Sequence, residues 1–170
     1  SELPSRAADN LYWMGRYIDR AEGLIRLLRA WHVRLGESGR ADSPLLEHAS
    51  RYPGFFGANP AKGVPKDLHM AIAAATASAG HVRDRFSVAG WTALNELAES
   101  ARLELSNIAP GYSSARALGL LLRQITGFSG LVHENMYRFS GWRFLSIGRS
   151  LERAATMASV LAWFADDEAP

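Results

Sequence analysis

Two seven-residue segments of the chain carry the same arrangement of arginines and acids. The segment Gly15-Arg16-Tyr17-Ile18-Asp19-Arg20-Ala21 returns near the other end as Gly148-Arg149-Ser150-Leu151-Glu152-Arg153-Ala154. Guanidinium groups bind carboxylates and phosphates through paired hydrogen bonds, and carboxylates can exchange protons with a substrate. The repeat therefore indicates ion pairing, anion binding or acid–base chemistry at one place in the fold.

Helical geometry places the charged groups of the first segment at the edge of an apolar stripe. Taking about 100° per residue, the apolar positions of this helix form one stripe of Leu11, Met14, Ile18, Ala21, Ile25 and Leu28. Three residues at i, i+4 and i+7 border the stripe: Gly15, Asp19 and Glu22. Arg16 lies beside Asp19, whereas Arg20 and Trp13 turn further away.

A glycine occupies the matched position of both segments. Glycine inside a helix is less favourable than alanine by about 1 kcal/mol, so its presence in both helices indicates that something approaches the helix backbone closely there. We therefore expect the first and last long helices to cross near Gly15 and Gly148.

Such a crossing would bring the charges of the two segments together. Arg16 would reach Glu152 and Arg149 would reach Asp19, as reciprocal ion pairs across a pseudo-twofold axis. Partly buried ion pairs persist when they are well hydrogen-bonded. Three interpretations stay open: the pairs fix the register of a helical bundle, the arginines bind the carboxylate or phosphate of a ligand, or the acids catalyse a reaction.

Candidate site residues follow from these interpretations. The candidates for ligand or partner binding are Arg16, Arg20, Arg149, Arg153, Trp13, Trp142 and Arg143. The pair Trp142-Arg143 joins them because an indole beside an arginine, just after a helix start, can form a ligand or partner surface. The candidates for acid–base catalysis are Asp19, Glu22 and Glu152.

Composition and motifs exclude several classes of function. The net charge is only +2 and the acids neutralise the arginines locally, so nucleic-acid binding is not expected. No apolar run approaches the roughly 20 residues that span a bilayer, and with no cysteine a reducing, cytoplasmic location is expected. Glu-x-x-His pairs of a di-iron bundle, nucleotide-binding loops and a nucleophile elbow are also missing. We expect no metal and no cofactor.

The remaining pattern is that of a helical bundle. Strand signals are nearly absent, and the 170 residues suit one domain, 1–170, with a substantial core. Helices are predicted over residues 5–35, 44–51, 65–86, 88–108, 113–138 and 142–164. Ser43, Ser87 and either Ser113 or Ser114 are the expected N-caps. The fold class is therefore all-α, a bundle of five to six helices whose first and last long helices form an internal pseudo-repeat.

Three blocks of the sequence together resemble a known family. They are residues 10–22 (NLYWMGRYIDRAE), residues 82–86 with 91–95 (VRDRF, WTALN) and residues 141–154 (GWRFLSIGRSLERA). In this order they are similar to the bacterial alpha-E domain family and span nearly the whole chain. The signature positions are then Asn10, Trp13, Gly15, Arg16, Arg20, Glu22, Trp142, Arg143, Gly148, Arg149, Glu152 and Arg153.

The resemblance implies an all-helical cytoplasmic protein, typically encoded beside or fused to circularly permuted ATP-grasp enzymes and transglutaminase-like peptidases. We therefore expect an accessory module of an amide-bond-forming system that binds a partner enzyme or an anionic, peptide-like ligand through the paired arginines and acids. The alternative is an enzyme in its own right, with Asp19, Glu22 or Glu152 as acid–base groups and Arg16 and Arg149 as electrostatic stabilisers.

Two departures from the family pattern affect these expectations. The family often carries an acidic pair before Gly-Trp-Arg-Phe, where this chain has Phe139-Ser140. Family members are also usually longer, so the chain is expected to be a truncated domain or a short variant. Apolar surface left exposed in this way would favour a homo-oligomer.

Overall fold

Helices form all the regular structure in the computed structural model, which describes residues 3–107 and 109–170. In that part of the chain the α-helices are α1 (Ser5–Ser38), α2 (Pro44–Ser50), α3 (Lys66–Gly80), α4 (Val88–Glu104), α5 (Tyr112–Asn135) and α6 (Ser140–Phe164). Two 3₁₀ turns, Pro53–Phe55 and Arg83–Arg85, precede α3 and α4. The all-α prediction is confirmed.

The ends of the helices agree with the sequence prediction at some places and differ at others. Ser43 and Ser87 cap α2 and α4 as predicted, since their hydroxyls accept the backbone N–H of Leu46 and Gly90. The helix predicted over 65–86 ends at Gly80, because the charged run that follows turns as a 3₁₀ segment into α4.

The start of α5 was predicted with the wrong cap. The Ser114 hydroxyl donates to the carbonyl of Ala109 instead of capping the helix, and Gly111 with a φ of 93° stands at the N-cap position. Since a positive φ favours glycine, the turn into α5 depends on that residue. The helix predicted to reach residue 108 ends at Glu104, and Ile108 lies outside the described residues.

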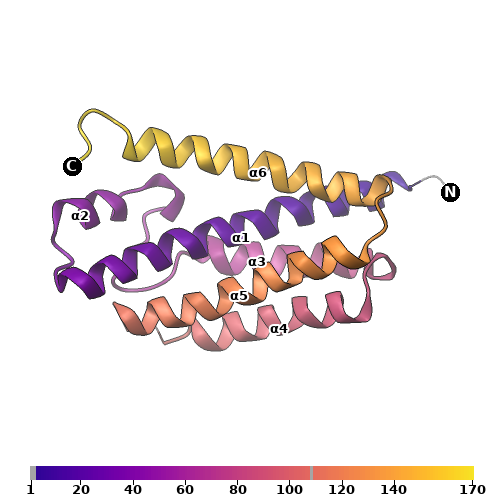
Figure 1. The fold of residues 1–170 in the computed structure, drawn as a ribbon, viewed down its shortest axis with the longest axis horizontal. Coiled ribbons are helices and arrows are strands. Elements are labelled where there is room, and N and C mark those ends of the chain that lie inside the picture. Colours follow the sequence, from indigo (N-terminus) through magenta and orange to yellow (C-terminus); the bar gives the residue numbers. More distant parts are fainter. Residues whose placement is uncertain (1–2, 108) are drawn as a thin grey trace.

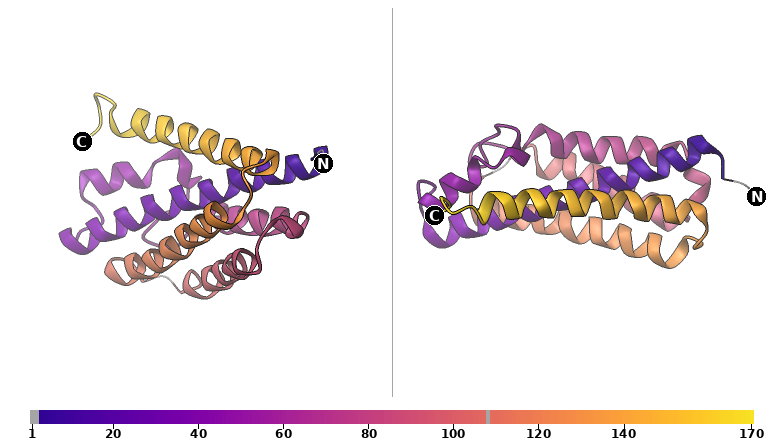
Figure 2. Two further views of the ribbon diagram at one scale, coloured as in Figure 1. Left: turned by 45° about the vertical axis from the view of Figure 1, so that its right-hand side comes forward. Right: turned by 90° about the horizontal axis from the view of Figure 1, so that it is seen from above.

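The long helix α1 runs through the middle of the bundle. It packs against α6 on one side and against α3 and α5 on the other, and α4 covers α5 and α3 from outside (Figure 1). The views in Figure 2 show α6 as an outer layer whose main neighbour is α1. Both helices begin at the same end of the molecule and run in the same direction.

The apolar stripe of α1 is the centre of the core. Its residues Leu11, Met14, Ile18, Ala21, Ile25 and Leu28 are at most 1% exposed. They share one cluster with apolar residues of the helices that pack on this side, such as Leu68 of α3 and Leu121 and Ile125 of α5. Burial of such side chains stabilises the fold by roughly 1.5–3 kcal/mol each, so this face of α1 holds α3 and α5 in place.

The other side of α1 meets α6 at two glycines. A Cβ atom on Gly15 would collide with the backbone carbonyl oxygen of Leu145, and a Cβ atom on Gly148 would collide with that of Tyr12. Tyr12 and Leu145 occupy equivalent positions of the repeat, so the contact is reciprocal. The predicted crossing of the two helices at Gly15 and Gly148 is confirmed.

A second contact holds the far end of α6. The indole N–H of Trp163 donates to the carbonyl of His48 at 3.0 Å, and the His48 ring stacks on the indole with centroids 4.8 Å apart. The carbonyl of Trp163 in turn lies 2.9 Å from His48 Nε2. Helix α2 therefore anchors the last turn of α6.

No helix in the described ranges combines the length and the apolar character needed to cross a membrane.

Replacing Gly15 by alanine should destabilise the fold although alanine is the better helix former. The new methyl group would push the α6 backbone away, and we expect a loss of at least about 2 kcal/mol in the free energy of unfolding, by overpacking. Gly127 is the matched control, because it lies within α5 and a Cβ there meets nothing within 4 Å. Gly127→Ala should instead stabilise by up to about 1 kcal/mol. Urea unfolding of both variants measures the difference, and equal effects would contradict the close contact.

Candidate functional site

Glu152 of α6 is held between two arginines of α1. Arg16 Nε donates to Glu152 Oε2 at 2.6 Å, and Arg20 Nε donates to Glu152 Oε1 at 2.7 Å. Arg16 also donates through Nη1 to the hydroxyl of Tyr12 at 2.8 Å, which fixes its orientation. The predicted Arg16–Glu152 pair is confirmed. The prediction that Arg20 turns away was wrong, because its long side chain reaches back to the helix contact.

Asp19 of α1 is held in the same way by two arginines of α6. Arg153 Nη2 donates to Asp19 Oδ1 at 2.9 Å, and Arg149 Nε lies 3.6 Å from the same oxygen. The predicted Arg149–Asp19 ion pair is confirmed, although Arg153 is the closer partner. Each acid therefore faces arginines at i and i+4 of the other helix, and we call these two groups the Glu152 clamp (Arg16, Arg20, Glu152) and the Asp19 clamp (Arg149, Arg153, Asp19).

A third carboxylate breaks the symmetry of the two clamps. Glu22 accepts from Arg26 Nη2 at 3.0 Å and from Arg153 Nη2 at 3.3 Å, and it lies 3.7 Å from Arg149. The equivalent position in α6 is Ala155, so only the Asp19 clamp has a second acid. Arg26 was missed in the sequence analysis, yet its i+4 spacing from Glu22 was the signal that could have found it.

Burial and hydrogen bonding shift the pKa values of the two central acids in opposite directions. Burial alone would raise the pKa of Glu152, but the hydrogen bonds from Arg20 and Arg16 outweigh it, and the pKa is lowered. The pKa of Asp19 is raised, because burial and the neighbouring charge of Glu22 outweigh the attraction of Arg153 and Arg149. Equivalent positions therefore have unequal electrostatic environments.

The centre holds more positive than negative charge. Five arginines, Arg16, Arg20, Arg26, Arg149 and Arg153, face four carboxylates: Asp19, Glu22 and Glu152 in the ion pairs, and Asp67 of α3, whose charge acts on Arg20. The three carboxylates of the ion pairs are only 5–8% exposed, whereas Arg26 and Arg153 are 57% and 59% exposed. Arg149 Nε is buried and has no hydrogen-bond partner among the described residues. The arrangement retains capacity for an added anion.

Two grooves open along the contact of α1 and α6, one beside each clamp. The first, of about 500 Å³, is lined by the charged residues Asp19, Glu22, Arg26 and Arg153 and by the apolar residues Leu27, Met157 and Val160. We call it the Arg153 groove. The second, of about 480 Å³, is lined by the charged residues Arg20, Asp67 and Glu152 and by the aromatic residues Tyr52 and Phe56, among others. Both combine charged residues with apolar ones.

The remaining predicted site residues lie away from these grooves. Trp13 is 38% exposed, stacks on Tyr17 and lies under the guanidinium of Arg16. The guanidinium of Arg138 lies 4.6 Å above the Trp142 ring, and Arg143 is exposed at the start of α6. Neither Trp142 nor Arg143 lines either groove.

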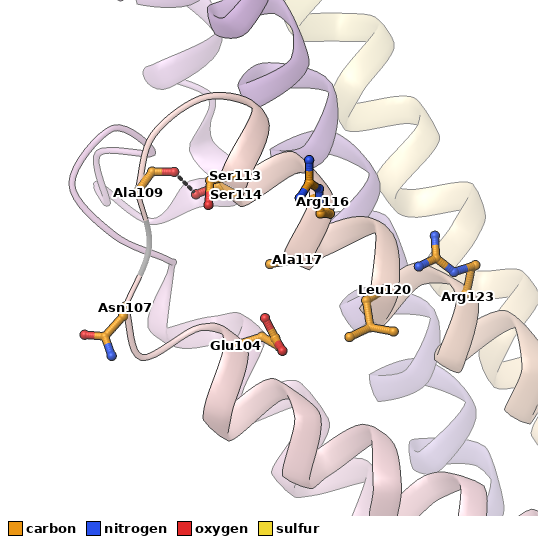
Figure 3. Close-up of a pocket in the computed structure, with 9 residues that line it drawn as sticks. All are labelled: Glu104, Asn107, Ala109, Ser113, Ser114, Arg116, Ala117, Leu120 and Arg123. Carbon is orange, nitrogen blue, oxygen red and sulfur yellow. Dashed lines mark hydrogen bonds between the residues drawn. The ribbon is translucent and has the colours of Figure 1, made fainter.

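A further pocket of about 380 Å³ lies between the end of α4 and the start of α5 (Figure 3). Glu104, Arg116 and Arg123 are its charged residues. It contains none of the residues that the sequence singled out, and its Ser114 hydroxyl is already engaged by a backbone carbonyl. In the described part of the chain, no three His, Asp or Glu side chains are grouped as metal ligands would be.

A comparison with protein families finds a match over nearly the whole chain. A family model, described as a predicted alpha-helical domain with a conserved ER motif, matches residues 3–169. Glutamate is followed directly by arginine only once in this sequence, at Glu152-Arg153, and the two side chains belong to different clamps. No curated protein and no solved structure matches the chain.

Glu152→Gln should destabilise the protein by about 2–3 kcal/mol at neutral pH, because it removes the carboxylate that lies between Arg16 and Arg20 and leaves two partly buried cations close to each other. Glu99→Gln is the matched control, since Glu99 pairs with Arg102 on the exposed face of α4, where such pairs contribute at most about 1 kcal/mol. Urea unfolding of both variants measures the two losses. Equal losses would show that the Glu152 clamp does not hold the helices together.

The unequal pKa shifts predict opposite pH trends for the two clamps. Because the folded-state pKa of Glu152 is lowered, its stabilisation is present at neutral pH and is lost as the pH falls through that pKa. The deficit of Glu152→Gln relative to wild type should therefore shrink between about pH 5 and 3. The pKa of Asp19 is raised, so the deficit of Asp19→Asn should grow as the pH falls. Free energies of unfolding across this range test both trends, and parallel trends would contradict the assignment.

Proposed function

The chain belongs to the Alpha-E family, and from that premise we propose that it is an accessory helical module that binds a carboxylate-bearing, peptide-like segment at the arginine–acid centre. The observation that carries this proposal is the exposure of two arginines of the ion-pair network at an open groove. Arg26 and Arg153 are more than half exposed and line the Arg153 groove. A guanidinium in that position can take up a second carboxylate through charge-assisted hydrogen bonds.

The apolar lining of the groove supports a peptide-like ligand. Leu27, Ala30, Met157 and Val160 line it together with the charged residues, so a carboxylate at Arg153 would leave aliphatic groups against an apolar surface. Sites for small ligands commonly combine such a surface with a few polar groups that fix orientation. A volume of about 500 Å³ accommodates a few residues.

The resemblance to the family supplies the expected source of that segment. Systems with ATP-grasp and transglutaminase-like enzymes make and cleave amide bonds, so a peptide terminus of the substrate or of the partner enzyme would present the required carboxylate. In this proposal the module positions the segment for the partner enzyme and performs no chemistry itself.

Acid–base catalysis by the chain itself has less support. Its favourable observation is the raised pKa of Asp19, next to the Arg153 groove. However, each of Asp19, Glu22 and Glu152 already accepts hydrogen bonds from arginines. An oxygen that already accepts a hydrogen bond from an arginine must give up that contact before it can take a proton from a substrate.

Binding of N-acetyl-leucyl-leucine, which has a free carboxylate, tests the proposal. We expect isothermal titration calorimetry to detect binding to the wild type, at least tenfold weaker binding to Arg153→Gln, and a similar loss when the ligand is the C-terminal amide. Loss of one hydrogen bond to a charged group removes about 1.5–3 kcal/mol, which corresponds to tenfold or more.

Arg34→Gln is the matched control, because Arg34 is an exposed arginine of α1 that lies outside the Arg153 groove. Equal affinity for the acid and the amide would contradict recognition of a carboxylate. For the partner enzyme, co-purification with an ATP-grasp protein should weaken in Arg149→Ala. Unchanged association would remove that arginine from the partner surface.

A further inference from the structure

A second, smaller hollow lies beside the Arg153 groove. It has a volume of about 140 Å³ and is lined by residues of α1, α2 and the turn between α2 and α3, and by Phe164 of α6. Leu27 and Ala30 of α1 line both this hollow and the Arg153 groove, so the two are adjacent along α1. We call the hollow the α1–α2 pocket.

The lining of the α1–α2 pocket is apolar and belongs to the folded bundle. Trp31, Leu46 and Phe55 are at most 4% exposed. Arg34 also borders the pocket, but its guanidinium is exposed and pairs with Glu37. The remaining lining residues are Leu27, Ala30, Leu45, Ala49 and Phe164. Such a lining offers a water molecule few hydrogen-bond partners, so an apolar group is the favourable occupant.

Hydrogen bonds hold this lining in place. The indole N–H of Trp31 donates to the carbonyl of Leu46 and to the hydroxyl of Ser50, both at 3.1 Å. The ring is therefore fixed between α1 and α2, and its polar atom is satisfied. Helix α2 is also bonded to the last turn of α6, where Phe164 lies. A pocket formed in this way before the ligand arrives reduces the cost of ordering on binding.

The volume of the pocket limits the size of the group that it can hold. An apolar cavity of about 150 Å³ accommodates one benzene ring. A volume of about 140 Å³ therefore suits the side chain of leucine, isoleucine, methionine or phenylalanine. A charged side chain would lose its hydration there without gaining a partner.

The distance between the pocket and the carboxylate site decides which residue of a peptide can reach it. Arg26 and Arg153 both donate to Glu22, so a carboxylate that they bind would lie near the level of Glu22 on α1. Ala30 is eight residues further along the helix, which is about 12 Å at 1.5 Å per residue. An extended peptide advances about 3.3–3.6 Å per residue. The side chain of the third residue from the carboxyl end therefore spans this distance.

We propose that the α1–α2 pocket binds a leucine-sized or phenyl side chain at the third residue from the free carboxyl end of the bound peptide. The inference rests on the proposed carboxylate site. It adds a determinant of specificity that the arginines do not provide, because they contact only the carboxylate.

Two acetylated tripeptides that differ in one side chain test the inference. By isothermal titration calorimetry, N-acetyl-leucyl-alanyl-alanine should bind the wild type at least tenfold more tightly than N-acetyl-alanyl-alanyl-alanine, because burial of a leucine side chain strengthens binding by about that factor or more. Ala49→Leu should remove this preference, since Ala49 lines the pocket but not the Arg153 groove. Equal affinity of the wild type for the two peptides overturns the inference.

Leu45→Ala is a second variant whose folding is not at risk, because Leu45 is 40% exposed. It should weaken binding of the leucine peptide at least threefold. Leu103→Ala is the matched control, since Leu103 is an exposed leucine of α4 that lines neither hollow, and it should bind as the wild type does. A full preference for leucine in both Leu45→Ala and folded Ala49→Leu overturns the inference.

Arg153→Gln separates this inference from the proposed function. It should weaken binding of both tripeptides by the same factor, because it alters the carboxylate site and leaves the pocket unchanged. If Arg153→Gln weakens binding but the wild type does not prefer leucine, the pocket alone is wrong. A leucine preference with affinities that neither Arg153→Gln nor a C-terminal amide reduces supports the pocket and overturns the carboxylate site. A wild type that binds neither peptide overturns both.

Discussion

The close contact of two helix backbones at Gly15 and Gly148 is the constraint on which the rest of the structure depends. With no side chain at either position, the carbonyls of Tyr12 and Leu145 approach the opposite helix directly. This sets the separation and the register of α1 and α6 one turn before Asp19 and Glu152. Arginines at i and i+4 can then reach the acid of the opposite helix, which they could not do across an ordinary layer of large side chains.

The two clamps that result are equivalent in position but not in chemistry. Glu152 lies between two arginines that donate short hydrogen bonds, and its pKa is lowered. Asp19 shares Arg153 with Glu22, and its pKa is raised. The Glu152 clamp therefore has the features of an ion pair that holds two helices together. The Asp19 clamp has more exposed arginines and an apolar groove beside it, so its arginines are better placed to bind the carboxylate of a ligand.

Helices α1 and α6 carry equivalent apolar stripes, but the two stripes have different surroundings. In α1 the stripe is the core, because α3 and α5 cover it. In α6 the corresponding stripe, from Phe144 to Leu161, faces outward, so the charged contact between the two helices lies beneath an apolar surface on the outside of the bundle.

The sequence by itself determined the helices, the core stripe of α1 and the crossing of the two repeat segments, because these depend on local spacing and on the missing side chain of glycine. It also identified the acids and arginines that meet, including the Arg16–Glu152 pair. The tertiary structure decided which arginine pairs with which acid. Arg20 and Arg26 belong to the ion-pair network because a long side chain can reach several acids, and the packing of the helices decides which acid is close enough. Local periodicity carries no information about those distances. The end of α3 at Gly80 and the Gly111 start of α5 depend likewise on where the chain must turn to meet its neighbours. Whether an apolar stripe is core or surface was decided only by which helices fold back upon it.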